Sequence, residues 1–140
     1  MDKILKLAKR LRHPTRGCPW DLKQDIRSVR NHTASEAREV RDAILKGNMK
    51  NLCEELGDVL WNVCFLITLA EEKRLFTAGD VRRGILKKMV HRHPHVFGKR
   101  KAKDAAEALK IFNDMKRRTG AKDGGGRRGP RRRSRMPRRA

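Results

Sequence analysis

The sequence has 140 residues, a formal net charge of +21 and 37% hydrophobic residues. This length suits one domain, and its most apolar stretch, residues 59–70, is too short to span a membrane as a helix. Three cysteines without CxxC or zinc-ligand spacing argue against a disulfide scaffold and indicate reduced thiols, so we expect a cytoplasmic protein.

The charge is unevenly distributed along the chain. Residues 119–140 contain nine Lys or Arg and one Asp, several glycines and almost no apolar side chain. This composition predicts a disordered tail behind an ordered domain of residues 1–118. Clustered arginines attract phosphates whatever the base sequence, so nonspecific nucleic-acid contact through the tail is a second candidate function.

The first twelve residues place Ile4, Leu5, Ala8 and Leu11 on one face of a basic helix. They lack the long apolar region of a secretory signal. An amphipathic helix of this kind either lies on a membrane surface or packs its apolar face into a core, and we favour the core.

Gly17 and Pro19 interrupt the chain and predict a loop over residues 15–21. Trp20 in this loop has two interpretations. It is either a core anchor, which composition alone favours, or an aromatic surface on which a nucleobase stacks.

Apolar periodicity predicts four further helices, over residues 25–46 (or 28–46), 49–74, 77–93 and 103–118. Gly47 closes the first of these as the residue past its carboxyl cap, the Thr77–Asp80 segment is a capping box, and Pro94 ends the helix that follows. Apolar side chains on nearly all faces of the helix over 49–74 suggest burial, in part against a second subunit. No segment alternates as a strand, so we predict an all-α fold, a bundle of four or five helices.

Two acidic pairs flank the turn at Gly47, namely Glu36 with Glu39 and Glu55 with Asp58. Each pair is spaced i, i+3 and therefore shares one helix face. Because the pairs are symmetric about position 47, an antiparallel hairpin sets the four carboxylates opposite each other. Their repulsion calls for a cation, and an all-oxygen ligand set suits Mg²⁺ or Mn²⁺ better than Zn²⁺.

The alternative is that these acids are ordinary surface residues in ion pairs with Arg38, Arg41 or Lys50. One ExxE pair alone would not decide between the two interpretations, because acidic residues are common on helix surfaces. Two pairs with mirror spacing favour the metal site.

A second polar cluster lies before and after Pro94. Lys88 and Arg92 are spaced i, i+4, which suits holding phosphate oxygens, and His93 is a further candidate donor. The alternatives are a solvated basic helix end, favoured by the helix dipole, and a zinc site formed by the histidines at 91, 93 and 95.

Three motifs in this order resemble the MazG-type nucleoside triphosphate pyrophosphohydrolases. Residues 17–21 with Gln24 are similar to the family's GCPWD..Q opening, Glu36-x-x-Glu39 with residues 54–58 to its EExxE…EELGD metal signature, and residues 92–98 to its RHPHVFG block. The resemblance implies an all-α dimer that uses Mg²⁺ to cleave an NTP or dNTP to the monophosphate and pyrophosphate.

On this resemblance, the expected site has three parts. The four carboxylates Glu36, Glu39, Glu55 and Asp58 hold the metal, Lys88, Arg92 and His93 contact phosphates, and Trp20 shapes the base pocket. The chain departs from the family at Ser35, where the signature has its first glutamate, at His32, where Tyr is usual, and over residues 24–29, where the family has QTHxSL. A catalytically weakened relative, acting as a structural or nucleic-acid-binding dimer, is therefore the alternative function.

Overall fold

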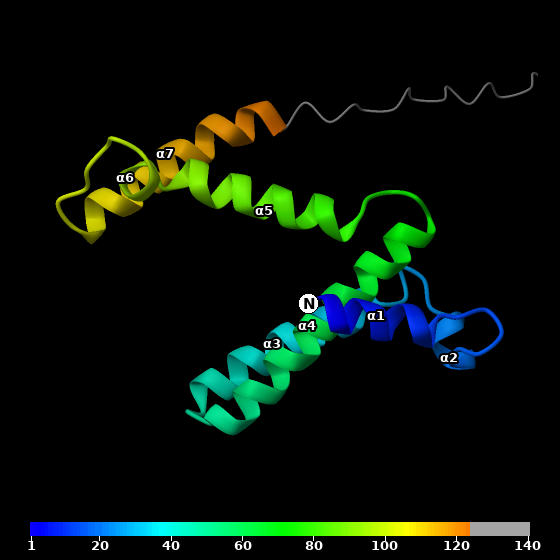
Figure 1. Cartoon of the computed structure of the whole chain (residues 1–140). Helices are drawn as coiled ribbons and strands as arrows, with labels where there is room; N and C mark the ends of the chain where they lie inside the picture. Colours follow the sequence, from blue (N-terminus) through cyan, green and yellow to red (C-terminus); the bar gives the residue numbers. More distant parts are fainter. Residues whose placement is uncertain (124–140) are drawn as a thin grey trace, which may run out of the picture. The chain divides into compact units, whose positions relative to one another are not determined.

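The computed structural model describes residues 1–123, with side chains through residue 120, and every regular element in this part is a helix. In chain order the helices are α1 (Asp2–Leu11), α2 (Pro19–Leu22), α3 (Arg30–Leu45), α4 (Met49–Glu72), α5 (Ala78–Arg92), α6 (Pro94–Phe97) and α7 (Ala105–Asp123) (Figure 1). The all-α prediction is confirmed. The chain divides into two compact units, with the boundary inside α5 at Gly84 and Ile85.

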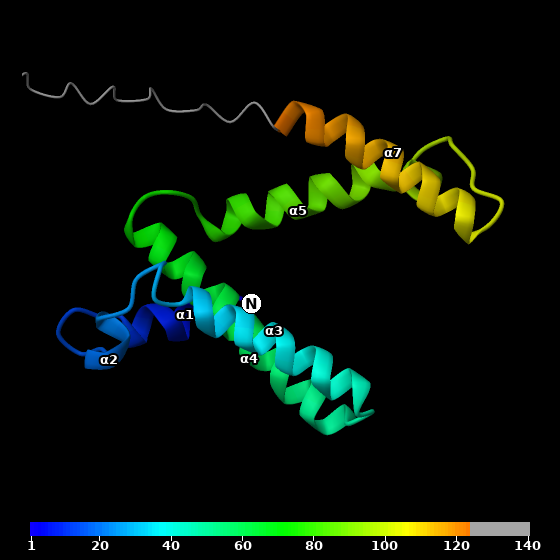
Figure 2. The same cartoon turned by 180° about the vertical axis from the view of Figure 1, so that it is seen from behind.

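Helices α3 and α4 form an antiparallel hairpin, and they lie side by side in both views (Figures 1 and 2). The turn is a Schellman motif, because the amide of Asn48 donates to Ala43 O and that of Gly47 to Ile44 O, each at 3.1 Å. Gly47 has φ 65°, a conformation that glycine adopts at little cost. Asn48 then caps α4 by accepting from the amide of Asn51 at 3.1 Å. The predicted hairpin about Gly47 is therefore present.

The core of the first unit lies where α1 packs against the carboxyl half of α4. Leu5 and Ala8 are buried against α4, so the prediction that α1 faces a core is confirmed. Two clusters fill this region, one of Leu5, Cys64, Ile67 and Ala78, the other of Ala8, Val29, Phe65 and Leu69. Burial of one such large apolar side chain contributes about 2 kcal/mol.

The amino half of α4 differs from the prediction of burial on nearly all faces. Leu56 and Leu60 are exposed, as are Ile44 on α3 and Met49 at the start of α4. The reason is that this end of the hairpin packs only α3 against α4, and α1 crosses α4 nearer its carboxyl end. The hairpin therefore presents apolar side chains on its surface.

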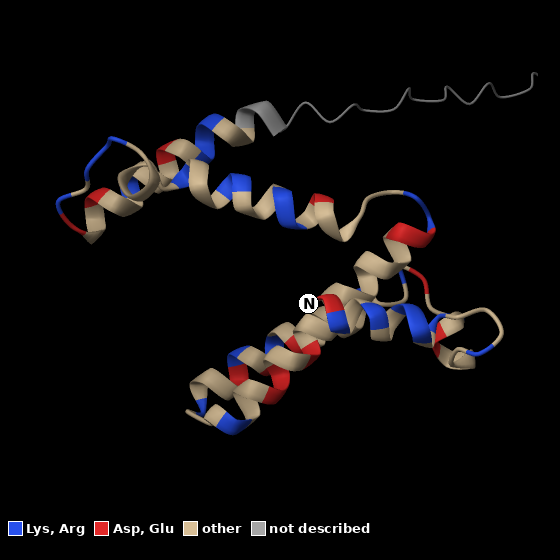
Figure 3. Cartoon of the chain, in the orientation of Figure 1, with Lys and Arg blue, Asp and Glu red and all other residues tan. Residues whose placement is uncertain are grey.

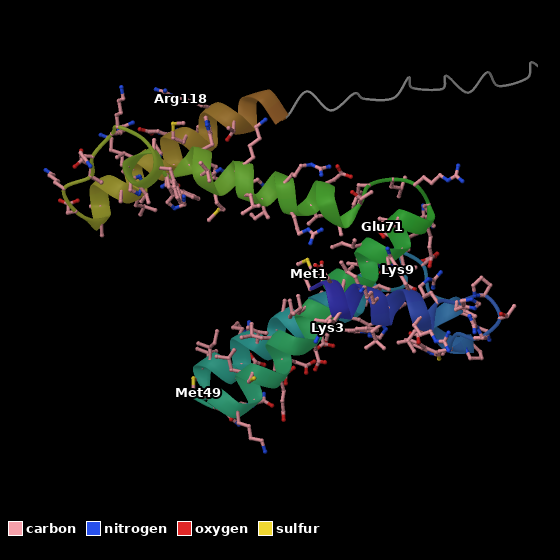
Figure 4. The ribbon with its side chains drawn as sticks, in the orientation of Figure 1. Met1, Lys3, Lys9, Met49, Glu71 and Arg118 are labelled. Atoms are coloured by element: carbon pink, nitrogen blue, oxygen red, sulfur yellow. The ribbon has the colours of Figure 1, made fainter. Side chains whose placement is uncertain are left out.

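One ion pair and one capping box fix the junction between α4 and α5. Lys9 on α1 and Glu71 on α4 are labelled in Figure 4, and Lys9 Nζ lies 2.7 Å from Glu71 Oε2. The other oxygen of Glu71 accepts from the amide of Ala78 at 2.9 Å, and these contacts, led by that of Lys9, lower the pKa of Glu71. The capping box is confirmed: the amide of Asp80 donates to Thr77 Oγ1 at 3.2 Å, and the amide of Thr77 to Asp80 Oδ2 at 2.8 Å.

Two one-turn helices depart from the sequence-based prediction. Pro19 and Pro94 each begin a short helix, α2 and α6, at its first position, where proline's missing amide is not needed. The loop predicted over residues 15–21 is therefore wrong at its end, although Pro94 does end α5 as expected. The last helix continues to Asp123, and the disordered tail predicted after it lies outside the described residues.

Within the second unit, α6 contacts α7, and Ile111 on α7 is fully buried. The ring of Phe112 is flanked by the guanidinium of Arg92, 5.6 Å from the ring centroid, and by the His93 ring at 5.3 Å. No helix in the described part of the chain is both long and apolar enough to cross a membrane.

Candidate metal centre and adjoining pocket

Three carboxylates meet on the α3–α4 hairpin. Glu36, Glu39 and Glu55 each place one carboxylate oxygen within 4.8 Å of the others. They come from facing helices, and Figure 3 shows acidic segments of α3 and α4 beside one another along the hairpin. Among the described residues, this is the one group of three or more acids, histidines or cysteines with the spacing of metal ligands. Asp58, the fourth predicted ligand, stands one turn further along α4 and is exposed.

The carboxylates make each other harder to ionise. The pKa of Glu36 is raised by partial burial and then by the charges of Glu39, Asp58 and Glu55. The pKa of Glu55 is raised by partial burial and then by Glu39. A bound cation would relieve this repulsion, and the ligand set contains only oxygen donors, as hard cations prefer. These residues therefore fit a Mg²⁺ or Mn²⁺ ion.

The alternative, that these acids are neutralised by neighbouring basic residues, is not what the structure shows. Arg41 pairs with Asp42 at 2.8 Å, and no ion pair within residues 1–120 includes any of the four acids. Glu39 instead accepts a hydrogen bond at 3.0 Å from the hydroxyl of Ser35, the residue that stands in place of the family's first glutamate. The negative charge of the group is thus left uncompensated by cationic side chains of the described chain.

A pocket of about 200 Å³ adjoins the carboxylates. Glu36 belongs both to the acidic group and to the pocket wall, and Asp58 lines the pocket as well. Three segments of the first unit supply the lining, which consists of Trp20, Asp21, Gln24, Val29, His32, Glu36, Asp58, Trp61, Asn62 and Phe65. The cavity is thus acidic at one end and aromatic at the other.

Trp20 is a wall of this pocket and not a core anchor. Its side chain is 59% exposed, and its ring meets that of His32 edge to face, with centroids 6.3 Å apart. The interpretation as a core anchor, which composition favoured, is therefore wrong. An exposed indole beside an open cavity is suited to stacking on a planar ligand.

Asn62 is the polar residue that the motif analysis missed. It is 8% exposed and lines the pocket, and its amide makes no side-chain hydrogen bond within the described residues. Thr68, the other buried polar residue of α4, donates to Cys64 O at 3.0 Å and is thereby satisfied. A buried amide without a protein partner is costly unless water or a ligand pairs with it. The signal in the sequence was an asparagine within the apolar run of residues 59–70.

The segment that carries Trp20 is tied closely to the end of α1. The amide of Gly17 donates to His13 O at 2.8 Å and that of Cys18 to Leu11 O at 2.7 Å. A Cβ atom at Gly17 would collide with both carbonyl oxygens, so no larger residue fits there without moving backbone. The Gly17 and Cys18 of the GCPWD motif therefore serve to bring the chain close to α1.

The predicted phosphate contacts lie in the second unit. Lys88 is exposed on α5, and Arg92 stacks on Phe112 with its Nε buried and without a hydrogen-bond partner in the described chain. His93 Nδ1 lies 2.6 Å from Met89 O, so this ring nitrogen is engaged by the backbone. The histidines at 91, 93 and 95 do not form a group with metal-ligand spacing within the part of the chain described, which corrects the zinc alternative.

Comparisons with known proteins agree with this geometry. A sequence model of the MazG nucleotide pyrophosphohydrolase domain matches residues 24–97. The chain is 37% identical over 116 residues to a nucleoside triphosphate pyrophosphohydrolase of Escherichia coli, covering 83% of this chain and 44% of that protein. It is 40% identical over 97 residues to a nucleoside triphosphate pyrophosphohydrolase/pyrophosphatase of Thermotoga maritima, covering 69% of this chain and 38% of that protein.

A solved structure shares the fold as well. The crystal structure of a MazG-related protein from Thermotoga maritima superimposes with a TM-score of 0.68 at 29% identity, covering 84% of this chain and 99% of that one. The chain spans less than half the length of the two curated relatives described above. Their names therefore describe longer proteins, of which this chain matches one part.

Proposed function

Because the chain belongs to the MazG nucleotide pyrophosphohydrolase family, we propose that it hydrolyses nucleoside triphosphates, ribo- or deoxyribo-, to the monophosphate and pyrophosphate. The observation that carries the proposal is the position of Glu36, which is shared by the acidic group and the aromatic pocket. A nucleotide fits such a site with its base in the pocket and its phosphates at the carboxylates.

Each end of the site has its own proposed task. Glu36, Glu39 and Glu55, with Asp58 beside them, would hold Mg²⁺ or Mn²⁺, which supplies charge neutralisation and an acidified water when bound. Trp20 would stack on the base, and the amide of Asn62 offers one donor group and one acceptor to its edge. The site therefore orients the α-phosphate toward the acidic end.

The reaction transfers one phosphoryl linkage to water. The oxygen of a water molecule bonds to the α-phosphorus, and the bond from that phosphorus to the α–β bridging oxygen breaks. The electron pair leaves with pyrophosphate, and the proton lost by the water passes to solvent or to the pyrophosphate. Lys88, Arg92 and His93 stay predictions for the neutralisation of the departing phosphates.

The test is product analysis with a panel of ribo- and deoxyribonucleoside triphosphates, with and without Mg²⁺ or Mn²⁺. Metal-dependent formation of monophosphate and pyrophosphate in equal amounts supports the proposal and ranks the substrates. Silence across the panel from folded protein, or release of inorganic phosphate in place of pyrophosphate, contradicts it.

The exposed apolar residues of the hairpin support the predicted homodimer. They include Ile44, Met49, Leu56 and Leu60, and a second copy would remove them from water. Sedimentation equilibrium should therefore give twice the mass of the chain. A monomer at micromolar concentration would contradict the dimer without bearing on the reaction.

The basic tail carries the second candidate function. Nine Lys or Arg and one Asp over residues 119–140 favour contact with nucleic-acid phosphates. Since α7 continues to Asp123, a truncation after this residue removes the tail and leaves the helix whole. We expect the truncated protein to keep its turnover and to lose salt-sensitive binding to single-stranded DNA. Unchanged DNA binding by the truncated protein would contradict the role of the tail.

A further inference from the structure

Arg12, the residue after α1, connects α4 to the segment that carries Trp20. Its Nε and Nη2 donate to the two oxygens of Glu72 at 2.6 and 2.7 Å, which makes a two-pronged ion pair. Its Nη1 donates to the backbone carbonyl of Asp21 and, at 3.2 Å, to that of Gln24. About four of the five guanidinium N–H donors are used in this way.

The environment of Arg12 fixes the plane of its guanidinium. The side chain is 10% exposed, and its central carbon lies 5.8 Å from the centroid of the Phe65 ring. A lysine would offer a single point of charge in place of this planar fork. Arg12 does not itself line the pocket, but its partners Asp21, Gln24 and Phe65 all do.

We propose that Arg12 is a positioning residue, which holds the wall formed by Trp20 and Gln24 in place and thereby sets the affinity for the nucleotide. Its contacts run to backbone carbonyls, so the wall is held whatever side chains Asp21 and Gln24 present. The acidic group stands on α3 and α4, which the hairpin turn joins directly, so metal binding does not depend on this brace. The identity of the ligand rests on the proposed function, whereas the brace itself does not.

A purely structural role for Arg12 makes a different prediction. If the arginine only stabilised the fold, its replacement would lower the melting temperature and leave the folded protein with unchanged substrate affinity. If it positions the pocket wall, the folded variant has a looser wall and a higher KM, with its metal affinity retained.

The first experiment is hydrogen exchange with Arg12→Gln and Arg12→Lys. The amides of Lys23 and Gln24 donate to Trp20 O and Asp21 O at 3.1 Å each, and they report directly on the wall. We expect exchange at these amides to become about tenfold faster in Arg12→Gln, because two hydrogen bonds from a charged donor are lost. The control is Arg82→Gln, which breaks the exposed pair of Arg82 with Asp2 (2.8 Å) at the other end of α1 and should leave these amides unchanged.

The second experiment separates KM from kcat. We expect Arg12→Gln to raise KM for the nucleoside triphosphate about tenfold and to change kcat less than about threefold, with Mn²⁺ affinity unchanged in titrations of the protein alone. Arg12→Lys should shift KM in the same direction, and it serves if the glutamine variant does not fold. Unchanged KM in a folded variant, or unchanged exchange at Lys23 and Gln24, overturns the proposal.

These measurements keep the two proposals apart. Exchange at Lys23 and Gln24 requires no nucleotide, so it tests the brace even if the wild-type protein hydrolyses none of the panel. Loss of Mn²⁺ affinity in Arg12→Gln, with the fold intact, would show that the brace supports the acidic group and would overturn the assignment of Arg12 to the pocket wall.

Discussion

The two ends of the candidate site are built in different ways. The acidic end depends on local geometry, since Glu36 and Glu39 share one face of α3 and the turn at Gly47 brings Glu55 opposite them. The aromatic end depends on distant contacts, since Trp20 stands on a short segment that Arg12 attaches to α4. The comparison teaches that the metal site should tolerate disturbance of the pocket wall, whereas the base site should be sensitive to residues outside it.

The largest expected effect is at the acidic end. Glu55→Gln should lower metal-dependent turnover about 100-fold or more, because it removes one charged ligand from the group of three. Circular dichroism should show unchanged helix content. The matched control is Glu54→Gln, which removes an exposed neighbouring carboxylate that does not belong to the group. Full activity of Glu55→Gln would rule out the assignment.

The next effect is at the aromatic end. Asn62→Ala should raise KM about tenfold for the preferred triphosphate and narrow the difference between bases, because the amide that reads the base edge is lost. Asn62→Gln, which retains the amide, should recover part of the preference. Asn113→Ala removes an exposed amide of α7 as a control. An unchanged base preference in Asn62→Ala would show that the base is read elsewhere.

The raised pKa of Glu36 and of Glu55 predicts a pH dependence of stability. Above the ordinary glutamate pKa, about 4.3, the folded metal-free protein binds more protons than the unfolded chain, so its stability falls as the pH rises through the raised values. Mn²⁺ should therefore raise the melting temperature by a few degrees more at pH 7.5 than at pH 5. Equal shifts at the two pH values, measured by calorimetry, would contradict the carboxylate site.

The smallest effect is expected at Ser35. Its hydroxyl donates to Glu39 at an exposed position, so Ser35→Ala should change turnover only about threefold. Ser35→Glu restores the first acid of the family signature and should strengthen Mn²⁺ binding, which isothermal titration can measure. If the glutamate variant bound metal no better than the wild type, the missing acid would have no part in the site of this chain.

The sequence predicted the helices and the acidic hairpin because both follow from local spacing. Gly47 marks its turn by its own conformational preference, and the i, i+3 pairs need only a helix to bring their members together. The role of Arg12 could not be predicted in this way. Its partner Glu72 lies sixty residues away in the chain, and one arginine at a helix end has no pattern that distinguishes it from the many others.

Burial along α4 was predicted only in part, for a related reason. Apolar periodicity shows which face of a helix avoids water, but it does not show what covers that face. At the carboxyl half α1 covers it, and Ile67 and Leu69 are buried; at the amino half Leu56 and Leu60 remain exposed in the single chain. Similarly, Asn62 was overlooked because apolar neighbours on both sides assign its position to the core.

The close approach of Gly17 to the end of α1 has a consequence for protein engineering. A library that aims to change base preference can vary Trp20 and His32, whose rings border an open cavity. It should keep Gly17 fixed, because any side chain there meets the carbonyl oxygens of Leu11 and His13 and would displace the whole segment. Diversity introduced at this glycine would mostly yield misfolded members, and the useful fraction of the library would fall accordingly.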